Sequence, residues 1–264
     1  MARARVQPVV ENETVQVVSF DPSGEVRILS SPVDVDDFTV SPVHRIDVRD
    51  KRPSGIELLV RGGGTSWLSV AMAPKSGGDT TVFAGARLVN GEWTSWTPLC
   101  LDSGMPSLTA ASETELFGIC EPVRAVRFDS AEYHLFSSSD GGLSFTDLGL
   151  VGPTGADRQP VVAVTGSTLV VAVSESESES GMILRTSRDG GRTWTTTHDP
   201  APAANSDASF PQLEFVTDTW GFALEAHYGG RGFDEDGELV AIPYTGRLLT
   251  TADAGASWAT VEFD

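Results

Sequence analysis

The stretch SRDGGRTW, residues 187–194, decides how this chain folds, because its pattern occurs twice more in the 264-residue sequence. The other copies are SSDGGLSF at 138–145 and TADAGASW at 251–258, so all three read [Ser/Thr]-x-Asp-x-Gly-x-[Ser/Thr]-[Trp/Phe]. These three segments are called the octets below. Recurrence of one pattern at intervals of tens of residues is the signature of a repeat architecture. The sequence therefore predicts similar structural units that follow one another along the chain.

Each octet predicts a tight hairpin connection between two antiparallel strands. Aspartate accepts hydrogen bonds from backbone N–H groups just after it, and glycine adopts the positive φ of a tight turn. The aromatic residue that ends the octet is expected to begin the outgoing strand and to bury its ring. The residues with this structural role are Ser138, Asp140, Gly142 and Phe145, then Ser187, Asp189, Gly191 and Trp194, and finally Thr251, Asp253, Gly255 and Trp258.

The octets resemble the Asp-box, also called the bacterial neuraminidase repeat, of sialidases, sortilin-type receptors and photosystem-assembly-factor-like proteins. In that family the box joins the third and fourth strands of β-propeller blades, away from the central ligand face. The phrase from Phe215 to Leu224 is also similar to the opening of photosystem-assembly-factor-like repeats. The resemblance implies a β-propeller in which Asp140, Asp189 and Asp253 are structural.

Strand-like runs separated by turn residues divide the chain into units, and four strands in about 40 residues is the unit of a propeller blade. We expect a single all-β domain over residues 1–264, a β-propeller of five or six four-stranded antiparallel blades. N-terminal strands are candidates to complete the last blade and so close the fold. The approximate blades are residues 8–50 (partial), 54–100, 105–150, 159–200 and 208–264. In the second of them Ser95-Trp96 mimics the end of an octet, after an Asn90-Gly91 hairpin signal.

The composition restricts the classes of partner. The formal net charge of −19 repels phosphate backbones, and no cluster of lysine and arginine offsets it locally, so nucleic acid is not expected as a partner. No apolar run approaches the length that spans a bilayer. The acidity by itself indicates no particular partner.

The two cysteines, Cys100 and Cys120, are too few for a disulfide scaffold or a four-ligand zinc site. One disulfide between neighbouring strands is expected if the protein is exported, and two buried thiols if it is not. The first residues lack the apolar segment of a secretory signal. Because the Asp-box family is mostly extracytoplasmic, we expect an extracytoplasmic or secreted protein whose signal has been removed, with a cytoplasmic location as the alternative.

Resemblance to sialidases also raises the question of catalysis. Such enzymes are similar in needing three arginines on the substrate carboxylate, a tyrosine nucleophile with a glutamate partner, and an aspartate acid/base. The phrase nearest to their entry motif, residues 44–47, lacks its proline, and the arginines are scattered. Tyr133 is expected to be a blade residue, whereas Tyr228 and Tyr244 flank an insertion with Glu225 and Glu238 nearby. A sialidase-like glycoside hydrolase therefore stays open as the alternative function.

The insertion from Tyr228 to Leu239 is the most distinctive loop and the first candidate for a partner contact; a tolerated surface insertion is the alternative. Alternate acidic positions before a turn suit Ca²⁺, although a solvated acidic hairpin is the simpler interpretation and no other cofactor is expected. The candidate binding residues are Tyr228, Arg231, Asp234, Asp236 and Glu238, the last three being the possible Ca²⁺ ligands.

Loops on a rigid propeller can be remade without disturbing the blades, which favours a non-catalytic scaffold that binds a protein or glycan partner. Binding of a glycan without hydrolysis would use exposed tryptophans as stacking platforms. Alternation along a strand places Trp93 and Trp96 on opposite faces, so one of them is a candidate for exposure. The tryptophans available for stacking are Trp67, Trp93, Trp96 and Trp220.

Overall fold

The structure is a computed structural model, and its described part consists of strands and turns with no helix. That part comprises residues 8–11, 14–20, 24–32, 34–35, 37–46, 51–61, 65–74, 82–99, 107–120, 131–154, 160–174, 182–200, 208–227, 231–233, 239–241 and 245–262. No described helix is long and apolar enough to cross a membrane.

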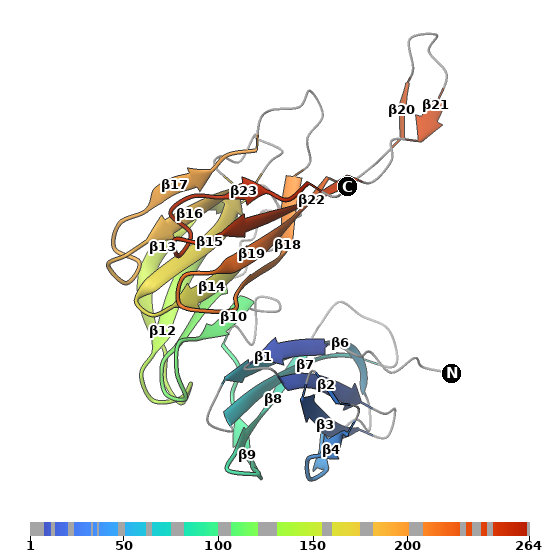
Figure 1. The fold of residues 1–264 in the computed structure, drawn as a ribbon. Helices are drawn as coiled ribbons and strands as arrows, with labels where there is room; N and C mark the ends of the chain where they lie inside the picture. The colour runs from blue at the N-terminus through green and yellow to red at the C-terminus, as the bar shows by residue number, and fades with distance from the viewer. Residues whose placement is uncertain are drawn as a thin grey trace. The chain divides into compact units, whose positions relative to one another are not determined.

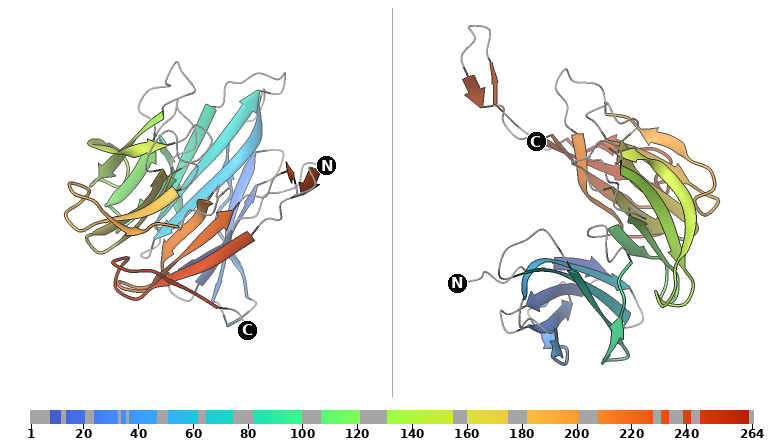
Figure 2. Two further views of the ribbon diagram at one scale, coloured as in Figure 1. Left: turned by 90° about the horizontal axis from the view of Figure 1, so that it is seen from above. Right: turned by 180° about the vertical axis from the view of Figure 1, so that it is seen from behind.

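Five antiparallel sheets follow one another along the chain, and in each the strands lie side by side in sequence order (Figures 1 and 2). The first sheet contains β1 (Pro8–Glu11), β2 (Thr14–Phe20), β3 (Glu25–Pro32), β4 (Thr39–Val40) and β5 (His44–Arg45). The second contains β6 (Lys51–Arg61), β7 (Thr65–Pro74), β8 (Val82–Val89) and β9 (Glu92–Trp96). The third contains β10 (Ser107–Ala110), β11 (Leu116–Cys120), β12 (Ala131–Ser138) and β13 (Thr146–Thr154). The fourth contains β14 (Val161–Thr165), β15 (Thr168–Ser174), β16 (Met182–Ser187) and β17 (Thr195–His198), and the fifth β18 (Ala208–Phe215), β19 (Gly221–His227), β22 (Thr245–Thr251) and β23 (Ala259–Thr260).

These sheets are five blades of a β-propeller, which confirms the predicted fold class. In the first blade the fourth position is shared by β4 and β5, which both pair with β3. Pro42 lies between these two short strands, and proline cannot donate to a strand ladder. The fourth strand is therefore interrupted there, which explains why the first blade looked only partial in the sequence.

The chain divides into two compact units, residues 1–116 with 137–146 and residues 117–136 with 147–264. The prediction of one domain over residues 1–264 stays a prediction. In the first unit the facing sides of the first two sheets form one apolar core, made by Val18, Val26, Ile28, Ile46, Leu68, Val70 and Met72.

In the second unit the fourth sheet shows most directly how sequence sets burial. Every described side chain of β15 from Leu169 to Val173 is buried, and β14 is buried after its first residue. Such short, continuous apolar runs indicate strands that are covered on both faces. One face of this sheet packs on the fifth sheet through Val170, Leu184, Phe210, Ala223 and Leu249.

The expectation that N-terminal strands complete the last blade is wrong for the described residues. The N-terminal strand β1 pairs with β2 in the first sheet, and all four strands of the fifth sheet come from residues 208–260. Each sheet is built from consecutive strands because short hairpin connections make sequence neighbours the nearest partners.

An insertion separates the second and third strands of the fifth sheet. The pair His227 and Thr245 ends the ladder of β19 and β22, and the octet follows the other end of β22. The insertion therefore leaves the sheet at the end opposite to the octet. It contains a small ribbon of β20 (Arg231–Phe233) paired with β21 (Leu239–Ala241).

Candidate functional site

All three octets connect the third strand of a sheet to the fourth, between β12 and β13, β16 and β17, and β22 and β23. In the first octet the Asp140 carboxylate accepts hydrogen bonds from the backbone N–H groups of Leu143 and Ser144, at 2.9 and 3.0 Å. It also accepts one from the Ser144 hydroxyl at 2.6 Å and one from Ser138 at 2.8 Å. Both carboxylate oxygens are thus used inside the loop.

The other octets repeat this arrangement. Thr193 donates its hydroxyl to Asp189 at 2.7 Å, and Ser257 donates its hydroxyl to Asp253 at 2.6 Å. The first residue of each octet also holds the loop, since the hydroxyls of Ser138, Ser187 and Thr251 accept the N–H of the glycine four residues on, at 2.8 to 2.9 Å. The role of the first position was not visible from turn chemistry alone.

These hydrogen bonds stabilise the charged form of each octet aspartate. The hydroxyl of Thr193, with its backbone N–H, lowers the pKa of Asp189 to about 2. The Ser257 hydroxyl lowers the pKa of Asp253 to about 2, and the Ser144 hydroxyl lowers the pKa of Asp140 as well. Carboxylates held in this state are poor proton donors at neutral pH, so the octet aspartates do not suit general acid catalysis.

Two successive residues of each octet have positive φ. The sequence pattern contains only one constant glycine and so predicted only one such position. In the second octet Gly190 and Gly191 have φ of 74° and 89°. In the third, Ala254 takes the first of these positions with φ of 57°, which is strained for a residue with a Cβ atom.

In the first and third octets, glycine carbonyl groups accept hydrogen bonds from the preceding sheet. In the first unit, Trp67 and Trp96 donate their indole N–H groups to the carbonyls of Gly141 and Gly142 at 3.0 and 2.9 Å. Arg87 adds a bond to the Gly141 carbonyl at 3.1 Å. A Cβ atom on Gly142 would lie 2.7 Å from the Trp96 indole nitrogen, so glycine is required there for the close approach.

The other two octets, in the second unit, also contact the preceding sheet, one through a hydrogen bond and one through close packing. Thr186 of the fourth sheet donates its hydroxyl to the Gly255 carbonyl of the third octet at 2.7 Å. Gly191 of the second octet lies against Leu135 of β12, where a Cβ atom would come within 2.5 Å of that side chain. Each octet is therefore a joint between its own sheet and the preceding one, which the sequence pattern did not reveal.

The aromatic residues of the octets differ from the prediction in one respect. Phe145, Trp194 and Trp258 lie one position before the outgoing strand and are half-buried rather than fully buried. Phe145 and Trp258 pack on apolar clusters shared with the preceding sheet. The three aromatic residues are therefore the last residues of the loops and not the first residues of the strands.

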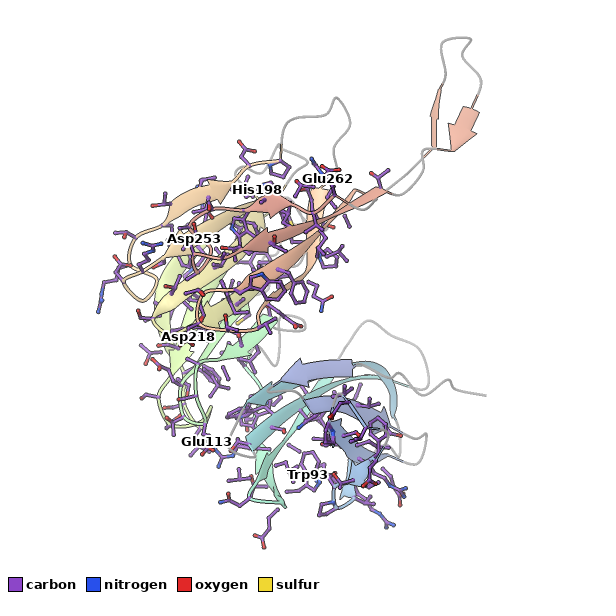
Figure 3. All side chains as sticks on the ribbon, in the orientation of Figure 1. Trp93, Glu113, His198, Asp218, Asp253 and Glu262 are labelled. Atoms are coloured by element: carbon purple, nitrogen blue, oxygen red, sulfur yellow. The ribbon has the colours of Figure 1, made fainter. Side chains whose placement is uncertain are left out.

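Most of the predicted stacking tryptophans are occupied inside the protein. Trp67 and Trp96 are buried, and Trp93, labelled in Figure 3, donates its N–H to the Pro42 carbonyl at 2.7 Å and stacks on His44. Trp93 and not Trp96 thus faces the preceding sheet as an octet aromatic does, which corrects the expected mimicry by Ser95-Trp96. Trp220 is the one of the four that is an exposed residue.

An ionic cluster around one buried carboxylate lies between the fourth and fifth sheets. The Glu225 carboxylate of β19 is fully buried and forms an ion pair with Arg247, its cross-strand neighbour on β22. Its second oxygen lies 3.1 Å from Nε2 of His198, at the end of β17 (Figure 3). The His198 ring also meets Phe210 edge-on. The Glu225–Arg247 pair lies two pairs from the end of the ladder at which the chain leaves for the insertion.

Sequence reasoning noted Glu225 only as a neighbour of Tyr228. A signal for a buried carboxylate was available, because Glu225 lies two positions after Ala223, on the same face of β19, and this face packs on the fourth sheet. An inward-facing carboxylate requires a cationic partner, and Arg247 is the arginine across the strand pair.

The candidate binding loop falls almost entirely outside the described residues. Tyr228, Asp234, Asp236 and Glu238 lie outside them, as does Tyr244, and Arg231 is described only as the first backbone position of β20. Their roles as partner contacts or Ca²⁺ ligands stay predictions. In the described part of the chain, no group of three or more histidine, cysteine or acidic side chains could hold a metal ion.

Cys120, at the end of β11, is buried and disulfide-bonded. Cys100, the other cysteine of the sequence, lies outside the described residues. Tyr133, on β12, is half-buried in the third sheet.

No family model matches this sequence, and no curated protein matches it in sequence. Solved structures are similar to it in fold. One is the β-propeller domain of the trilobed protease of Pyrococcus furiosus, which is described as having an open velcro topology. Its TM-score is 0.54 at 9% sequence identity, and the match covers 99% of this chain and 69% of the protease chain.

Two further neighbours are named for action on glycans. A candidate exo-β-1,3-galactanase of Bifidobacterium bifidum has a TM-score of 0.53 at 11% sequence identity, and the match covers 98% of this chain and 91% of the galactanase chain. The Trypanosoma rangeli sialidase has a TM-score of 0.52 at 12% identity, covering 94% of this chain but only 46% of the sialidase. At such identities these likenesses show the β-propeller fold alone.

Proposed function

We propose that this chain is a non-catalytic Asp-box β-propeller that serves as a binding scaffold for a protein or glycan partner. The observation that supports this most is how the octets are used. Their carboxylate oxygens are bound within each loop, and in the first and third octets glycine carbonyls are bound by the preceding sheet. The end of the sheets that carries the octets therefore has a structural role, and we place partner binding at the opposite end.

The opposite end carries the connections between second and third strands, because antiparallel strands alternate in direction. In the fifth sheet that connection is the insertion, with Arg231 in its ribbon and Tyr228 at its start. The Glu225 cluster braces the two strands from which the insertion leaves. A braced base with a variable loop is the arrangement by which rigid folds present binding residues.

The glycoside hydrolase alternative has one observation in its favour. Glu225, Arg247 and His198 gather at the insertion end, and Tyr228 and Tyr244 border that insertion in the sequence. Glu225, however, is fully buried and paired with both partners, which favours a structural role over attack on a substrate.

Turnover assays separate the two functions. The full chain is incubated with a fluorogenic sialoside and a panel of neutral and acidic fluorogenic glycosides, next to an enzyme-free blank. The scaffold predicts no release above the blank. The hydrolase would be established instead if the wild type shows turnover that is lost in Tyr228→Phe or Tyr244→Phe and kept in Tyr133→Phe.

A glycan array probed with the labelled full chain then separates the two kinds of partner. Glycan binding is assigned to the insertion if the wild type binds particular glycans, the Arg231→Glu variant does not bind them, and the Arg192→Glu variant still does. Arg192 is a matched control because it lies in the second octet, at the other end of the sheets. Absence of any retained glycan would leave a protein as the partner that the proposal requires.

A further inference from the structure

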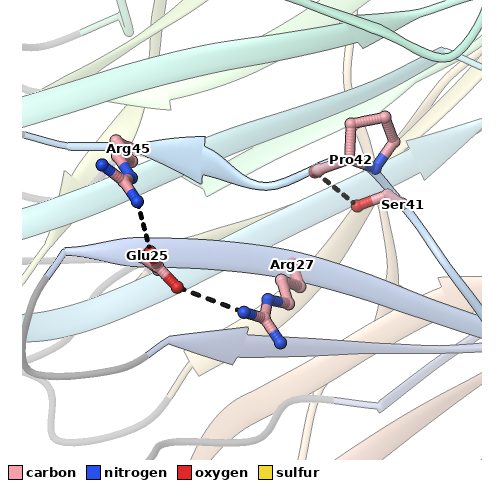
Figure 4. Close-up of polar contacts among 5 residues, drawn as sticks. All are labelled: Glu25, Arg27, Ser41, Pro42 and Arg45. Atoms are coloured by element: carbon pink, nitrogen blue, oxygen red, sulfur yellow. Dashed lines mark hydrogen bonds and ion pairs between the residues drawn. The ribbon is translucent and has the colours of Figure 1, made fainter.

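The fourth-strand position of the first sheet contains a segment with a short backbone ladder. Residues 41–46, which we call the edge segment, run from the end of β4 through Pro42 into the two-residue strand β5 (Figure 4). The segment is tied to the β3 side by the two pairs of β5 and by backbone N–H donation from Ser41 and Ile46, at 2.8 and 2.9 Å. A short edge strand held by so short a ladder opens at a lower free-energy cost than the central strands of a sheet.

Two side chains of the edge segment face the apolar core between the first two sheets, those of Ile46 and His44. Ile46 belongs to that core, and so does Val26, the cross-strand neighbour of His44, which shares its face. The imidazole of His44 stacks on Trp93 of β9, with ring centroids 5.0 Å apart and ring planes at 32°. Trp93 also donates its indole N–H to the Pro42 carbonyl at 2.7 Å. His44 and Trp93 therefore join the edge segment to the second sheet.

The charged side chains described near His44 lie on other faces of the strands. Alternation places Arg45, Arg27 and Glu25 on the opposite face of the first sheet, where both arginines form ion pairs with the carboxylate (Figure 4). On β9 the charged residue is Glu92, which is exposed and alternates to the other face of its strand. The described side chains of the second sheet that pack on this core are all apolar: Leu68, Val70, Met72, Ala84, Leu88 and Trp93.

A proton on His44 would therefore be a charge without a described carboxylate beside it, at the border of an apolar core. Burial lowers the pKa of His44 from its ordinary value of 6.5. The stability that neutral His44 contributes is fully present above pH 6.5, and it is lost as pH falls through the lowered value. Attraction between an imidazolium and the Trp93 ring acts in the opposite direction, and a titration of His44 measures the balance.

We propose that the edge segment is a pH-sensitive device, which closes on the second sheet while His44 is neutral and opens when His44 takes up a proton in mild acid. Opening separates His44 from Trp93 and uncovers the edge of β3, whose backbone groups can then pair with another strand. Mild acidity thus controls access to this edge. Every contact named here lies within the first unit, and the device does not depend on the scaffold function.

Hydrogen exchange of the full chain by mass spectrometry, between about pH 7.5 and about pH 5.5, tests the proposal. Protection of residues 39–46, corrected for the intrinsic exchange rate, is expected to decrease toward low pH, by at most about tenfold per pH unit because one proton is involved. The central strand β15 of the fourth sheet is the internal reference and should keep its protection. An equal decrease in β15 would mean that the whole protein loses stability, which contradicts a local device.

The variant His44→Phe removes the proton site and keeps an aromatic ring against Trp93. Protection of residues 39–46 should then no longer depend on pH in this range. His134→Phe is the matched control, because His134 lies on β12 beside Asp147 and outside the edge segment. This control should show the pH dependence of the wild type.

Arg45→Gln separates the imidazole from the neighbouring ion pair. It removes the Arg45 contact to Glu25 but leaves His44 in place. Protection of residues 39–46 should fall by the same factor at every pH, so that the pH dependence is kept. Loss of the pH dependence in Arg45→Gln would assign it to the ion pair and overturn the role of His44.

A proton NMR titration of the histidine rings of the wild type gives a measurement that does not depend on exchange. The His44 ring, assigned from the spectrum of His44→Gln, should titrate with a pKa below 6.5. A pKa of 6.5 or above, protection of residues 39–46 that is constant with pH, or a pH dependence that persists in His44→Phe would each overturn the proposal. Circular dichroism melts check that the variants fold, and His44→Gln replaces His44→Phe in the exchange experiment if the latter does not.

Discussion

At the scale of single residues, the octets work because a few polar groups satisfy one another in a small space. The aspartate gathers backbone N–H groups and a hydroxyl, and the first Ser or Thr holds the glycine N–H. The sequence predicted the aspartate and the glycine because turn chemistry is local. The additional left-handed position, one residue before the predicted glycine, escaped prediction, since Gly141, Gly190 and Ala254 share only a backbone conformation and not a residue type.

The strain at Ala254 leads to a prediction. Ala254→Gly should stabilise the protein by about 0.5–1 kcal/mol, because relief of the left-handed strain exceeds the added chain entropy of the unfolded state. The free energy of unfolding from urea titration measures this effect.

Gly190→Ala is the matched reverse change. Gly190 has φ of 74° and open space where a Cβ atom would be, so only backbone strain is added. It should destabilise by about 1 kcal/mol. If both substitutions shift stability in the same direction, left-handed strain does not govern this position.

At the scale of elements, the strands were predictable and the joints between them were not. The strands of the fourth sheet were predictable because their apolar runs, the Gly166 turn and the octet are all encoded locally. Hydrogen bonds such as that from Trp96 to Gly142 join residues far apart in sequence, so periodicity cannot show them. Trp96 was considered as a sugar platform for this reason, and it is a donor to an octet instead.

Removal of one such donor tests the importance of the joint. Trp96→Phe keeps most of the ring but leaves the buried Gly142 carbonyl without its indole partner, which should cost about 1–3 kcal/mol. Urea unfolding at neutral pH measures this cost.

Trp93→Phe is the control, because Trp93 also donates to a carbonyl but in an exposed position where water replaces the indole. Its cost should be clearly the smaller of the two. Equal losses for both variants would mean that the octet joint adds nothing beyond ordinary packing.

At the scale of the whole molecule, the three octet aspartates make stability sensitive to acid. Their pKa values are lowered in the folded state, to about 2 for Asp189 and Asp253, from an ordinary value of 3.8. A lowered pKa contributes stability that is fully present above the unfolded value and is lost as pH falls through the folded value. The loss is therefore expected between about pH 4 and pH 2.

Urea midpoints measured from pH 7 to pH 2 check this expectation. The wild type should lose stability in that window, and an Asp189→Asn, Asp253→Asn double variant should start lower at pH 7 and fall less steeply. Parallel curves for the two proteins would show that the octet carboxylates are not the source of the acid sensitivity.

Hydrogen exchange by mass spectrometry on the Asp253→Ala variant tests most directly whether the octets are joints between successive sheets. The account predicts faster exchange in residues 251–258 and also in β15 and β16 of the fourth sheet, where Val170 and Thr186 receive Gly255. The first two sheets should exchange as in the wild type. Faster exchange confined to residues 251–258, with β15 and β16 unchanged, would contradict the account.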